Sequence, residues 1–482
     1  MNILGRLVES TLRSIYSTLL NLGYQLSPEA FNLIKESENP EYLVSELIKR
    51  LESMENKPII IERTHIEPLI TKKISSPISL EQKKEKYLPS IKILRSGGKY
   101  SVESSPEAFR SYFLDRFNKL KSILNSRADV RAYNSNNKKV KIIGIVASKK
   151  ETKDKIAIEL ENEKGITKIL FKDKELKKKA SRIMLDEVIC VFGTIIENIG
   201  VIGEDIIWPD ITPRIRQNIK REGYIVFTSD IHIGSKFFMR QQFESFIKWL
   251  RGENDEKEIA SKVKYLIIAG DIVDGIGIYP NQEEELIIKD IYKQYEEAAY
   301  YLSMIPEDIK IIIIPGNHDA CRQTLPTPPI YKDIGAPLYS LKNVVMLGDP
   351  SFIEIENLVF LITHGRSLDD VIPVIPNCTF KEPQKAMIEL LKSRHIAPIY
   401  GEKTPIAPEP EDMLVIDIIP DIFHAGHVHV WGISEYQGTF VINSGTWQKQ
   451  TKYQQSMGIE PAPGIVPVID LSNFKITTLN FL

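Results

Sequence analysis

The stretch Tyr224-Ile-Val-Phe-Thr-Ser-Asp-Ile-His232 decides the fold of the C-terminal half of the chain. Its apolar run predicts a buried strand, and two metal-ligand residue types, Asp230 and His232, follow that run at once. Four later stretches repeat the pattern and end in Asp271 and Asp274, in Asn317 and His318, in His364, and in His427 and His429. Strands that alternate with helices along residues 220–482 indicate an α/β domain.

The residue types after these strands are those that hold divalent metal ions. Sites in α/β sheets form outside the carboxyl ends of the strands, so we expect the five loops to converge. Imidazole, carboxylate and amide groups together suit Mn²⁺, Fe²⁺ or Zn²⁺, and the lack of a thiolate argues against structural zinc. An isolated Asp-x-His or His-x-His is more often structural, but five such loops in this order predict a metal site.

The distribution of histidine supports this prediction. The chain has only eight histidines, and five of them lie in the strand-end loops. Histidines scattered through a core would not gather in this way. The other three, His65, His395 and His424, are expected at the surface or packed in the core without a metal.

Length and composition limit the class of protein. A chain of 482 residues predicts two to four folding units, and 43% hydrophobic with 26% charged residues excludes global disorder. The 62 Lys and Arg residues against 64 Asp and Glu give a net charge of −2, so nucleic acid would have to bind through local patches. No apolar run approaches a membrane span, and no secretory signal is apparent, so a cytoplasmic location is expected.

Four further segments precede the α/β domain. Residues 1–56 show helical spacing of apolar residues and indicate a helical accessory domain. Residues 57–104 are polar, with Gly and Pro breakers, and are expected to form a flexible linker. Residues 105–137 are predicted to hold a connecting helix. Short alternating strands over residues 138–217 indicate a small β-barrel, with an OB-type barrel as the first choice.

The predicted barrel has a lysine-rich surface that allows two interpretations. Lysines crowd its loops, at Lys149, Lys150, Lys153, Lys155, Lys172, Lys174, Lys177, Lys178 and Lys179. Three glutamates, at positions 159, 161 and 163, dilute this charge. A solvated surface and a nucleic-acid groove therefore both stay open. Gly144, inside the first strand, is expected to mark a bulge or a bend.

Taken together, the motifs DxH, GDxxD, GNHD, H and GHxH resemble those of the calcineurin-like metallophosphoesterase superfamily. The stretches 363–371, 397–401, 404–412 and 443–448 are similar to the small subunits of archaeal family D DNA polymerases. This resemblance covers about residues 105–482, and the N-terminal helical unit fits more loosely. It implies a multidomain α/β plus β fold, in which a four-layer α/β/β/α phosphoesterase domain follows the OB-type barrel.

The superfamily roles imply two metal ions, with Asp271 as the bridging carboxylate. By this resemblance the first ion is held by Asp230, His232, Asp271 and His429. The second is held by Asp271, Asn317, His364 and His427. Mn²⁺ is the first choice of metal, and Mg²⁺, Fe²⁺ and Zn²⁺ are alternatives.

Other residues would act on the substrate. His318 is expected to stabilise the phosphate or to protonate the leaving 3′ oxygen. Asp274 stands where double-strand-break repair nucleases of the superfamily have a histidine, and it is expected to orient His318 by a hydrogen bond. Arg366 is expected either to contact phosphate or to form a surface ion pair. The aromatic side chains expected to stack on bases are Phe237, Phe238 and Trp447.

The resemblance implies a role in DNA replication. Such a subunit carries a 3′–5′ exonuclease for proofreading and binds a large subunit that holds the polymerase active site. The expected partners are therefore the large subunit, the primer 3′ end and, as a further candidate, a sliding clamp. Two alternatives stay open. One is a catalytically silent scaffold subunit, and the other is a metallophosphoesterase that acts on a non-DNA phosphoester.

Overall fold

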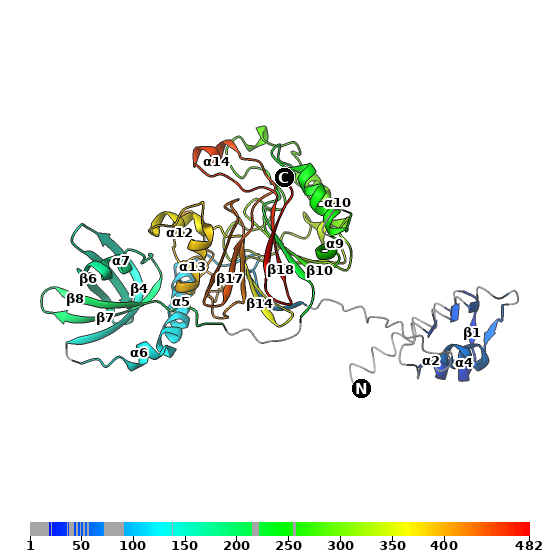
Figure 1. Ribbon diagram of the computed structural model, residues 1–482. Coiled ribbons are helices and arrows are strands. Elements are labelled where there is room, and N and C mark those ends of the chain that lie inside the picture. Colours follow the sequence, from blue (N-terminus) through cyan, green and yellow to red (C-terminus); the bar gives the residue numbers. More distant parts are fainter. Residues whose placement is uncertain are drawn as a thin grey trace. The chain divides into compact units, whose positions relative to one another are not determined.

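Two six-stranded sheets form the domain that contains the predicted ligands (Figure 1). The computed structural model describes residues 19–20, 22–35, 37, 43–44, 47–48, 50–51, 54, 57–71, 91–136, 138–214, 221–253 and 257–482. In order, the first sheet contains β12 (Val344–Met346), β11 (Lys310–Ile314), β10 (Val263–Ala269), β9 (Tyr224–Thr228), β18 (Ile465–Asp470) and β19 (Ile476–Asn480). The second contains β16 (Gly432–Tyr436), β17 (Thr439–Asn443), β15 (Ile422–Ala425), β14 (Leu358–Ile362), β13 (Ser351–Ile355) and β3 (Ile91–Ser96).

The continuous apolar runs of the strands bury both faces of the sheets. Side chains alternate along a strand, so Ile225 and Phe227 of β9 point to one face and Val226 points to the other. The first pair joins a cluster shared by the two sheets, which also contains Ile353 and Phe360 of the second sheet. The sheets therefore pack against each other.

Helices cover the remaining face of each sheet. A cluster on the first sheet includes α8 (Arg240–Leu250) and α10 (Ile291–Ser303). A cluster on the second includes α12 (Leu368–Val374) and α13 (Pro383–Ser393). Shorter helices in this domain are α9 (Lys257–Ala260), η1 (Gln282–Glu284), α11 (Ala336–Tyr339) and α14 (Lys452–Ser456).

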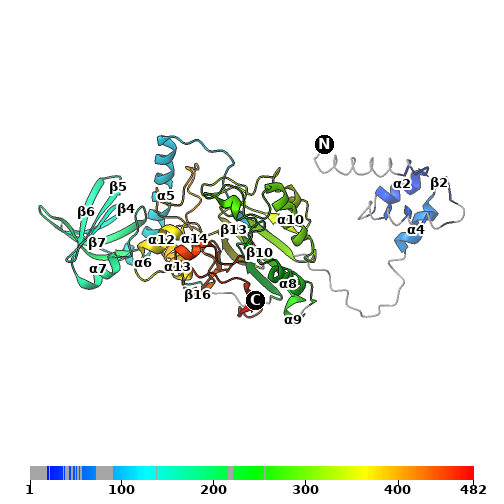
Figure 2. The same ribbon diagram turned by 90° about the horizontal axis from the view of Figure 1, so that it is seen from above.

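A closed five-stranded barrel lies beside this domain (Figure 2). Its strands, in order, are β4 (Lys139–Glu151), β5 (Ile156–Asn162), β6 (Gly165–Phe171), β8 (Gly200–Ile207) and β7 (Val188–Ile196), and α7 (Lys174–Ala180) follows β6. The register shift in β4 falls between Val146 and Ser148, so the bulge is not at Gly144 as expected. A side chain at Gly144 would instead collide with the carbonyl oxygen of Glu161 on β5.

Helix α5 (Pro106–Ser126), followed by α6 (Ala128–Ala132), joins the barrel to the two-sheet domain. Its apolar side chains Phe117 and Leu120 cluster with Val188 of the barrel. On its other side, the fully buried Arg116 donates to the carboxylate of Asp412 at 2.8 Å. The helix therefore shares a core with the barrel and an ion pair with the neighbouring domain.

The linker prediction for residues 57–104 is wrong for three segments that the structure describes, of which Ile60–Ile61 is a short strand, β2, in the N-terminal unit. Residues Ile91–Ser96 form β3, which pairs with β13 at the edge of the second sheet. Residues Arg63–Thr71 form α4, which belongs to a separate N-terminal unit, Met1–Tyr87. Polar side chains between the apolar residues hid β3 and α4, because an edge strand and a short surface helix bury only one side. Residues 72–90 lie outside the described residues.

The described residues of the N-terminal unit form a small core of their own. Strand β1 (Gln25–Leu26) pairs with β2 (Ile60–Ile61), and α2 (Pro28–Lys35) follows β1. Leu19, Ile34, Leu47 and Ile66 are buried together. Residues 1–18 of the predicted helical accessory domain lie outside the described part.

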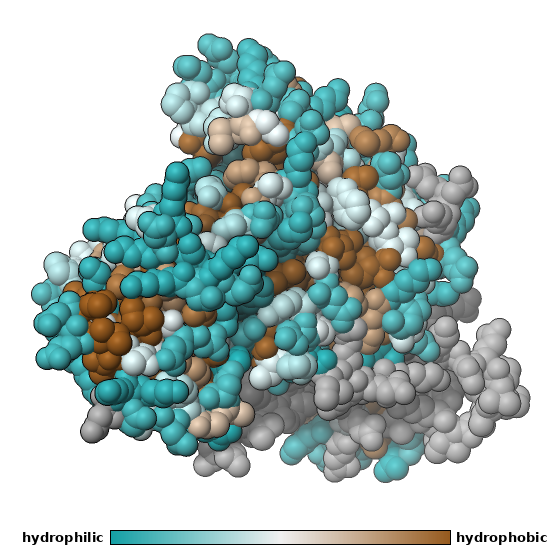
Figure 3. Space-filling view, turned by 60° about the vertical axis from the view of Figure 1, so that its left-hand side comes forward, coloured by the Kyte–Doolittle hydropathy of each residue, from teal (hydrophilic) through white to brown (hydrophobic). Residues whose placement is uncertain are grey.

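The molecular surface combines polar areas with apolar patches (Figure 3). On the barrel, the exposed large apolar side chains include Ile166, Ile195, Ile196 and Ile199, at the β7–β8 hairpin and the start of β6. Within the described residues, we find no helix with the length and apolar character needed to cross a bilayer.

Candidate metal centre and its pocket

The five predicted strand ends meet at one place, three from the first sheet and two from the second. The backbone there is strained. Five of the expected ligands adopt positive φ angles: Asp230 (52°), His232 (55°), Asp271 (52°), His427 (73°) and His429 (60°). Each such residue costs roughly 1–3 kcal/mol, and such strain tends to cluster at functional sites. The backbone conformation that directs these side chains toward the site therefore lowers the stability of the folded chain.

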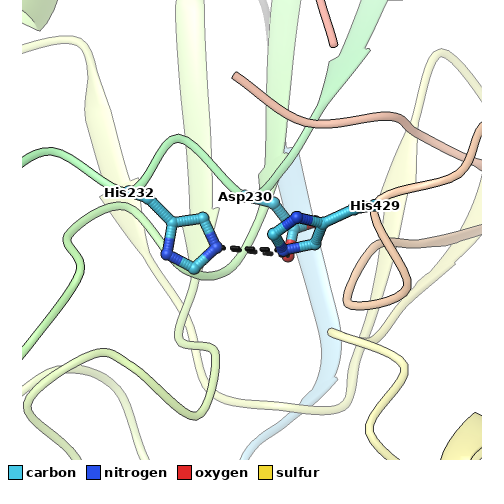
Figure 4. Close-up of side chains that lie close together, drawn as sticks. All are labelled: Asp230, His232 and His429. Atoms are coloured by element: carbon cyan, nitrogen blue, oxygen red, sulfur yellow. Dashed lines mark hydrogen bonds and ion pairs between the residues drawn. The ribbon is translucent and has the colours of Figure 1, made fainter. Parts of the chain in front are cut away.

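The first group of ligand atoms consists of Asp230, His232 and His429 (Figure 4). The Nε2 atoms of His232 and His429 lie 3.1 Å apart, and Nε2 of His429 lies 3.4 Å from Oδ1 of Asp230. Ligand atoms that each lie about 2.0–2.2 Å from one ion would be spaced in this way. Oδ2 of Asp271 lies 3.8 Å from Nε2 of His232, which links this group to the next one.

The second group surrounds Nε2 of His364. Oδ2 of Asp271 lies 3.2 Å from that nitrogen, Oδ1 of Asn317 lies 3.1 Å from it, and Nδ1 of His427 lies 3.3 Å from it. These are the four residues expected around the second ion. Their nitrogen and oxygen donors fit a divalent cation, as those of the first group do.

Glycines leave room for this close packing. A side chain at Gly316 would collide with the carboxylate of Asp271, and one at Gly270 would meet the ring of His364. Only a residue without Cβ allows the two loops to approach in this way.

Hydrogen bonds on the far side of the rings orient three of the histidines. Nδ1–H of His232 donates to Asp274 at 3.0 Å, and Nδ1–H of His364 donates to the carbonyl of Ala269 at 2.8 Å. Nε2–H of His427 donates to Oδ2 of Asp369 at 3.1 Å. Each bond leaves the other ring nitrogen free to face the centre of the site.

The expected role of Asp274 in orienting His318 is wrong in one respect. Its carboxylate binds His232, whereas its main-chain carbonyl accepts the bond from Nδ1–H of His318 at 2.7 Å. Side-chain amides of Gln282 and Gln448 also donate to the Asp274 carboxylate.

The carboxylates create a negative potential at the site. Burial alone would lower the pKa of His364, but the neighbouring Asp271 and Asp230 outweigh it and raise that pKa to about 10. Burial would raise the pKa of Asp271, yet His364 and His318 hold it well below its usual value. Burial lowers the pKa of His318, which favours the neutral form of its ring. Such a site favours cations.

A pocket of about 540 Å³ opens over these residues. The residues that line it include His232, Asp271, Asn317, His318, His427 and His429, together with Tyr279, Phe380, Lys403, Tyr453 and Met457. His318, Asp274 and five of the seven metal candidates therefore line one cavity, whereas Asp230 and His364 are not among its lining residues.

Some sequence-based choices lie away from this pocket. Trp447 is 1% exposed and packs in the core, where its Nε1–H donates to Oγ1 of Thr228, so the base-stacking prediction for it is wrong. The guanidinium of Arg366 donates to the carbonyl of Gln323 at 2.6 Å. Lys403 lines the pocket, and no sequence pattern pointed to it because it lies far from any ligand motif.

The remaining histidines lie apart from the two groups of ligand atoms. His395 donates to Asp412 at 2.9 Å, and Nε2 of the buried His424 lies 3.0 Å from the hydroxyl of Ser444. Nδ1 of His65 accepts from the main-chain N–H of Glu62 in the N-terminal unit. Each therefore has a partner other than the candidate metal ligands.

Comparison with known proteins gives close relatives. A family model for the B subunits of DNA polymerases alpha and epsilon matches residues 225–429. The chain is 41% identical over 462 residues to the DNA polymerase II small subunit of Archaeoglobus fulgidus, and the match covers 92% of this chain and 93% of that protein. The small subunit of Methanothermobacter thermautotrophicus is 36% identical over 472 residues, with 94% and 97% covered.

Coverage is lower for other relatives. The Pyrococcus horikoshii DNA polymerase II small subunit is 41% identical over 397 residues, and the match spans 80% of this chain but 64% of that protein. Among solved structures, Vps29 of Entamoeba histolytica with Zn²⁺ matches at 12% identity and a TM-score of 0.26, over 54% of this chain and 99% of that one.

Proposed function

This chain belongs to the family of archaeal DNA polymerase II small subunits, and from that premise we propose that it is a two-metal 3′–5′ exonuclease. It would hydrolyse the terminal phosphodiester of a primer and so proofread the product of a large polymerase subunit. The observation that carries the proposal is the pair of ligand groups linked by Asp271 at the floor of one pocket.

The donor sets suit two divalent ions. Asp230, His232 and His429 would hold one ion, with Asp271 shared, and Asn317, His364 and His427 would hold the other. Mn²⁺ is the first choice, with Mg²⁺, Fe²⁺ and Zn²⁺ as alternatives. When bound, the ions would supply Lewis-acid stabilisation of the phosphoryl oxygens and a lower pKa for water.

His318 is the proposed proton donor. Its Nδ1–H is held by the carbonyl of Asp274, so Nε2 is left for the substrate. The ring can take up a proton from solvent water when the anionic phosphodiester binds, and Nε2–H can then deliver that proton to the leaving 3′ oxygen. Asp274 supports this step through its main chain and holds His232 through its carboxylate.

The proposal includes an architecture. The two packed sheets with outer helices would be the four-layer α/β/β/α domain of calcineurin-like phosphoesterases, over residues 220–482. The closed barrel would be an OB-type domain over residues 138–217, with the connecting segment 105–137 before it and the helical accessory domain at the N-terminus.

A scaffolding role would accompany catalysis. The exposed isoleucines on the barrel, Ile166, Ile195, Ile196 and Ile199, favour it, because exposed apolar clusters often mark protein contacts. The large polymerase subunit is the proposed partner. The primer 3′ end would enter the pocket, and Arg366 is a candidate contact for its phosphate. A sliding clamp is a further candidate partner.

A primer assay tests the exonuclease. The full chain, with and without the large subunit, is incubated with Mn²⁺ and a 5′-labelled primer. Stepwise shortening from the 3′ end is expected, and Asp271→Asn and His318→Ala should reduce it, the latter about 10²- to 10⁴-fold. His65→Ala, a histidine outside the site, is the matched control. A wild-type protein that binds Mn²⁺ but leaves the primer intact would overturn the exonuclease and favour the scaffold.

A further inference from the structure

The pocket over the metal centre has aromatic walls that the catalytic groups do not explain. Tyr279 precedes η1, and its hydroxyl donates to Glu285 at 2.8 Å, which fixes the ring. That ring lies 6.3 Å from the ring of His318, centroid to centroid. Tyr279 therefore stands next to the proposed proton donor.

Tyr453 reaches the same pocket from a distant part of the sequence. It lies on α14, which Figure 1 shows near the top of the two-sheet domain. Nε2 of Gln454 on this helix lies 2.7 Å from Nδ1 of His429, and the side chain of Thr451 caps the helix. The helix is thus anchored to the metal centre, yet Tyr453 is 66% exposed. An anchored aromatic side chain that stays uncovered is suited to stack on a ligand.

Three polar side chains in the pocket lining that could read base edges already have hydrogen-bond partners. The amide nitrogen of Gln448 donates to Asp274 and Ser235, and the amide oxygen of Gln454 accepts from the main-chain N–H of Thr451. Glu285 is taken by Tyr279. A base in this pocket would therefore contact the faces of aromatic rings rather than free hydrogen-bond donors and acceptors of these side chains.

One cation in the pocket remains available. Within the described part of the chain, no hydrogen bond or ion pair engages Nζ of Lys403, although its main-chain N–H donates to Asp370. An ammonium group on a tethered backbone is suited to contact a phosphate next to the scissile one.

We propose that Tyr453, Tyr279 and Lys403 position the 3′-terminal nucleotide in this pocket (the nucleotide subsite), and that they do so for any of the four bases. Tyr453 and Tyr279 supply stacking faces, and Lys403 contacts the backbone. The volume, about 540 Å³, lies in the range of pockets that hold one small ligand. The inference rests on the proposed function and adds to it the residues that would hold the terminal nucleotide, since a stacked and paired base could not reach the rings.

Oligonucleotides with a normal or an abasic 3′-terminal nucleotide test the subsite. With Mn²⁺ and normal ends, the four terminal bases should be removed at rates within about threefold of one another, because stacking tolerates any base. Tyr453→Ala should raise KM about 5- to 100-fold with little change in kcat. Tyr453→Phe should restore the wild-type KM. Tyr300→Ala, an equally exposed tyrosine (62%) on α10, is the control.

The abasic end separates the inference from the proposed function. Wild type should act poorly on it, and Tyr453→Ala should then cause no further loss. If wild type removes abasic and normal ends equally well, or prefers one base more than about 30-fold, the subsite is wrong while the exonuclease stands. If wild type degrades neither end, the proposed function itself fails.

Lys403→Ala tests the phosphate contact. It should weaken binding of all sequences alike and reduce the slope of log affinity against log salt by about one. Lys381→Ala, an exposed lysine that does not line the pocket, should change neither value. An unchanged salt slope in Lys403→Ala would remove this residue from the subsite.

Discussion

At the residue scale, the site depends on groups that hold the ligands as much as on the ligands. His232 and His427 each donate to a carboxylate, from Asp274 and Asp369 respectively. These bonds fix which ring nitrogen faces the centre, and they raise the basicity of that nitrogen. Asp369 lies in the first turn of α12, five residues after His364, and no ligand pattern singles it out.

Asp369→Asn should therefore weaken metal binding at the proposed second site. We expect Mn²⁺ affinity to fall about 10- to 100-fold at that site, because the amide keeps the shape but loses the charge that supports His427. Calorimetric titration of the full chain measures this without any substrate. Asp333→Asn, an exposed carboxylate elsewhere, is the control. Equal affinities for Asp369→Asn and wild type would show that His427 needs no such support.

Single residues also show what sequence patterns can reveal. The convergence of these candidate ligands could be predicted because each follows an apolar strand directly, and strand ends meet at one edge of a sheet. Lys403 and Gln454 could not be predicted, because they reach the pocket from loops and a short helix far from the motifs. The carboxylate of Asp274 was assigned to the wrong histidine, since spacing along the chain does not determine which ring lies nearer.

At the element scale, strands with two buried faces were easier to predict than edge strands. β9, β10 and β11 are continuous apolar runs, whereas β3 mixes Lys92 and Arg95 into a strand that pairs on one side only. β8 is hard to predict for a similar reason, because Gly203, Glu204 and Asp205 interrupt its apolar pattern. The base-stacking prediction for Trp447 is wrong because closeness to a motif in the sequence does not determine whether a ring faces the pocket or the core.

Trp447→Ala tests how the first sheet is stabilised next to the site. The ring packs against Phe243 and Phe246 of α8, and its N–H is bonded to Thr228. We expect a loss of about 3–5 kcal/mol in the free energy of unfolding, from the cavity and the unpaired hydroxyl. Urea denaturation measures it. Trp431→Ala, at a 41% exposed tryptophan, should cost less than about 0.5 kcal/mol. Similar losses in the two variants would contradict this packing.

At the scale of the whole molecule, a buried polar network ties α5 to the two-sheet domain. Asp412 accepts from Arg116, from the hydroxyl of Tyr112 and from Nε2–H of His395. Nδ1 of His395 accepts the main-chain N–H of Ala397 at 3.1 Å, so this ring is held neutral. Burial and then the charge of Arg116 lower the pKa of His395 to about 4.

This network predicts acid sensitivity. An unfolded histidine has a pKa of about 6.5, so between pH 6.5 and 4 the unfolded chain binds a proton that folded His395 refuses. Stability should therefore fall as pH drops through that window. Unfolding by urea at pH 7 and pH 5 checks this, and His395→Gln should flatten the difference because glutamine does not titrate. An unchanged pH dependence in His395→Gln would contradict the assignment.

The apolar end of the barrel gives a prediction about assembly. Ile196→Asp with Ile199→Asp should weaken co-purification with the large subunit, because charge would have to be buried at the contact. Ile287→Asp, at a 68% exposed isoleucine of the other domain, is the control. Full retention of the large subunit by the double variant would place the contact elsewhere.

The proposed function requires metal ions to act on the terminal phosphodiester of a DNA strand. The most direct test replaces one non-bridging oxygen of that phosphate with sulfur and compares hydrolysis in Mg²⁺, Mn²⁺ and Cd²⁺. Because softer ions accept sulfur better, the rate relative to the normal phosphate should rise in that order for one stereoisomer. A ratio that is the same in all three ions, or hydrolysis that persists in EDTA, would contradict the two-metal account.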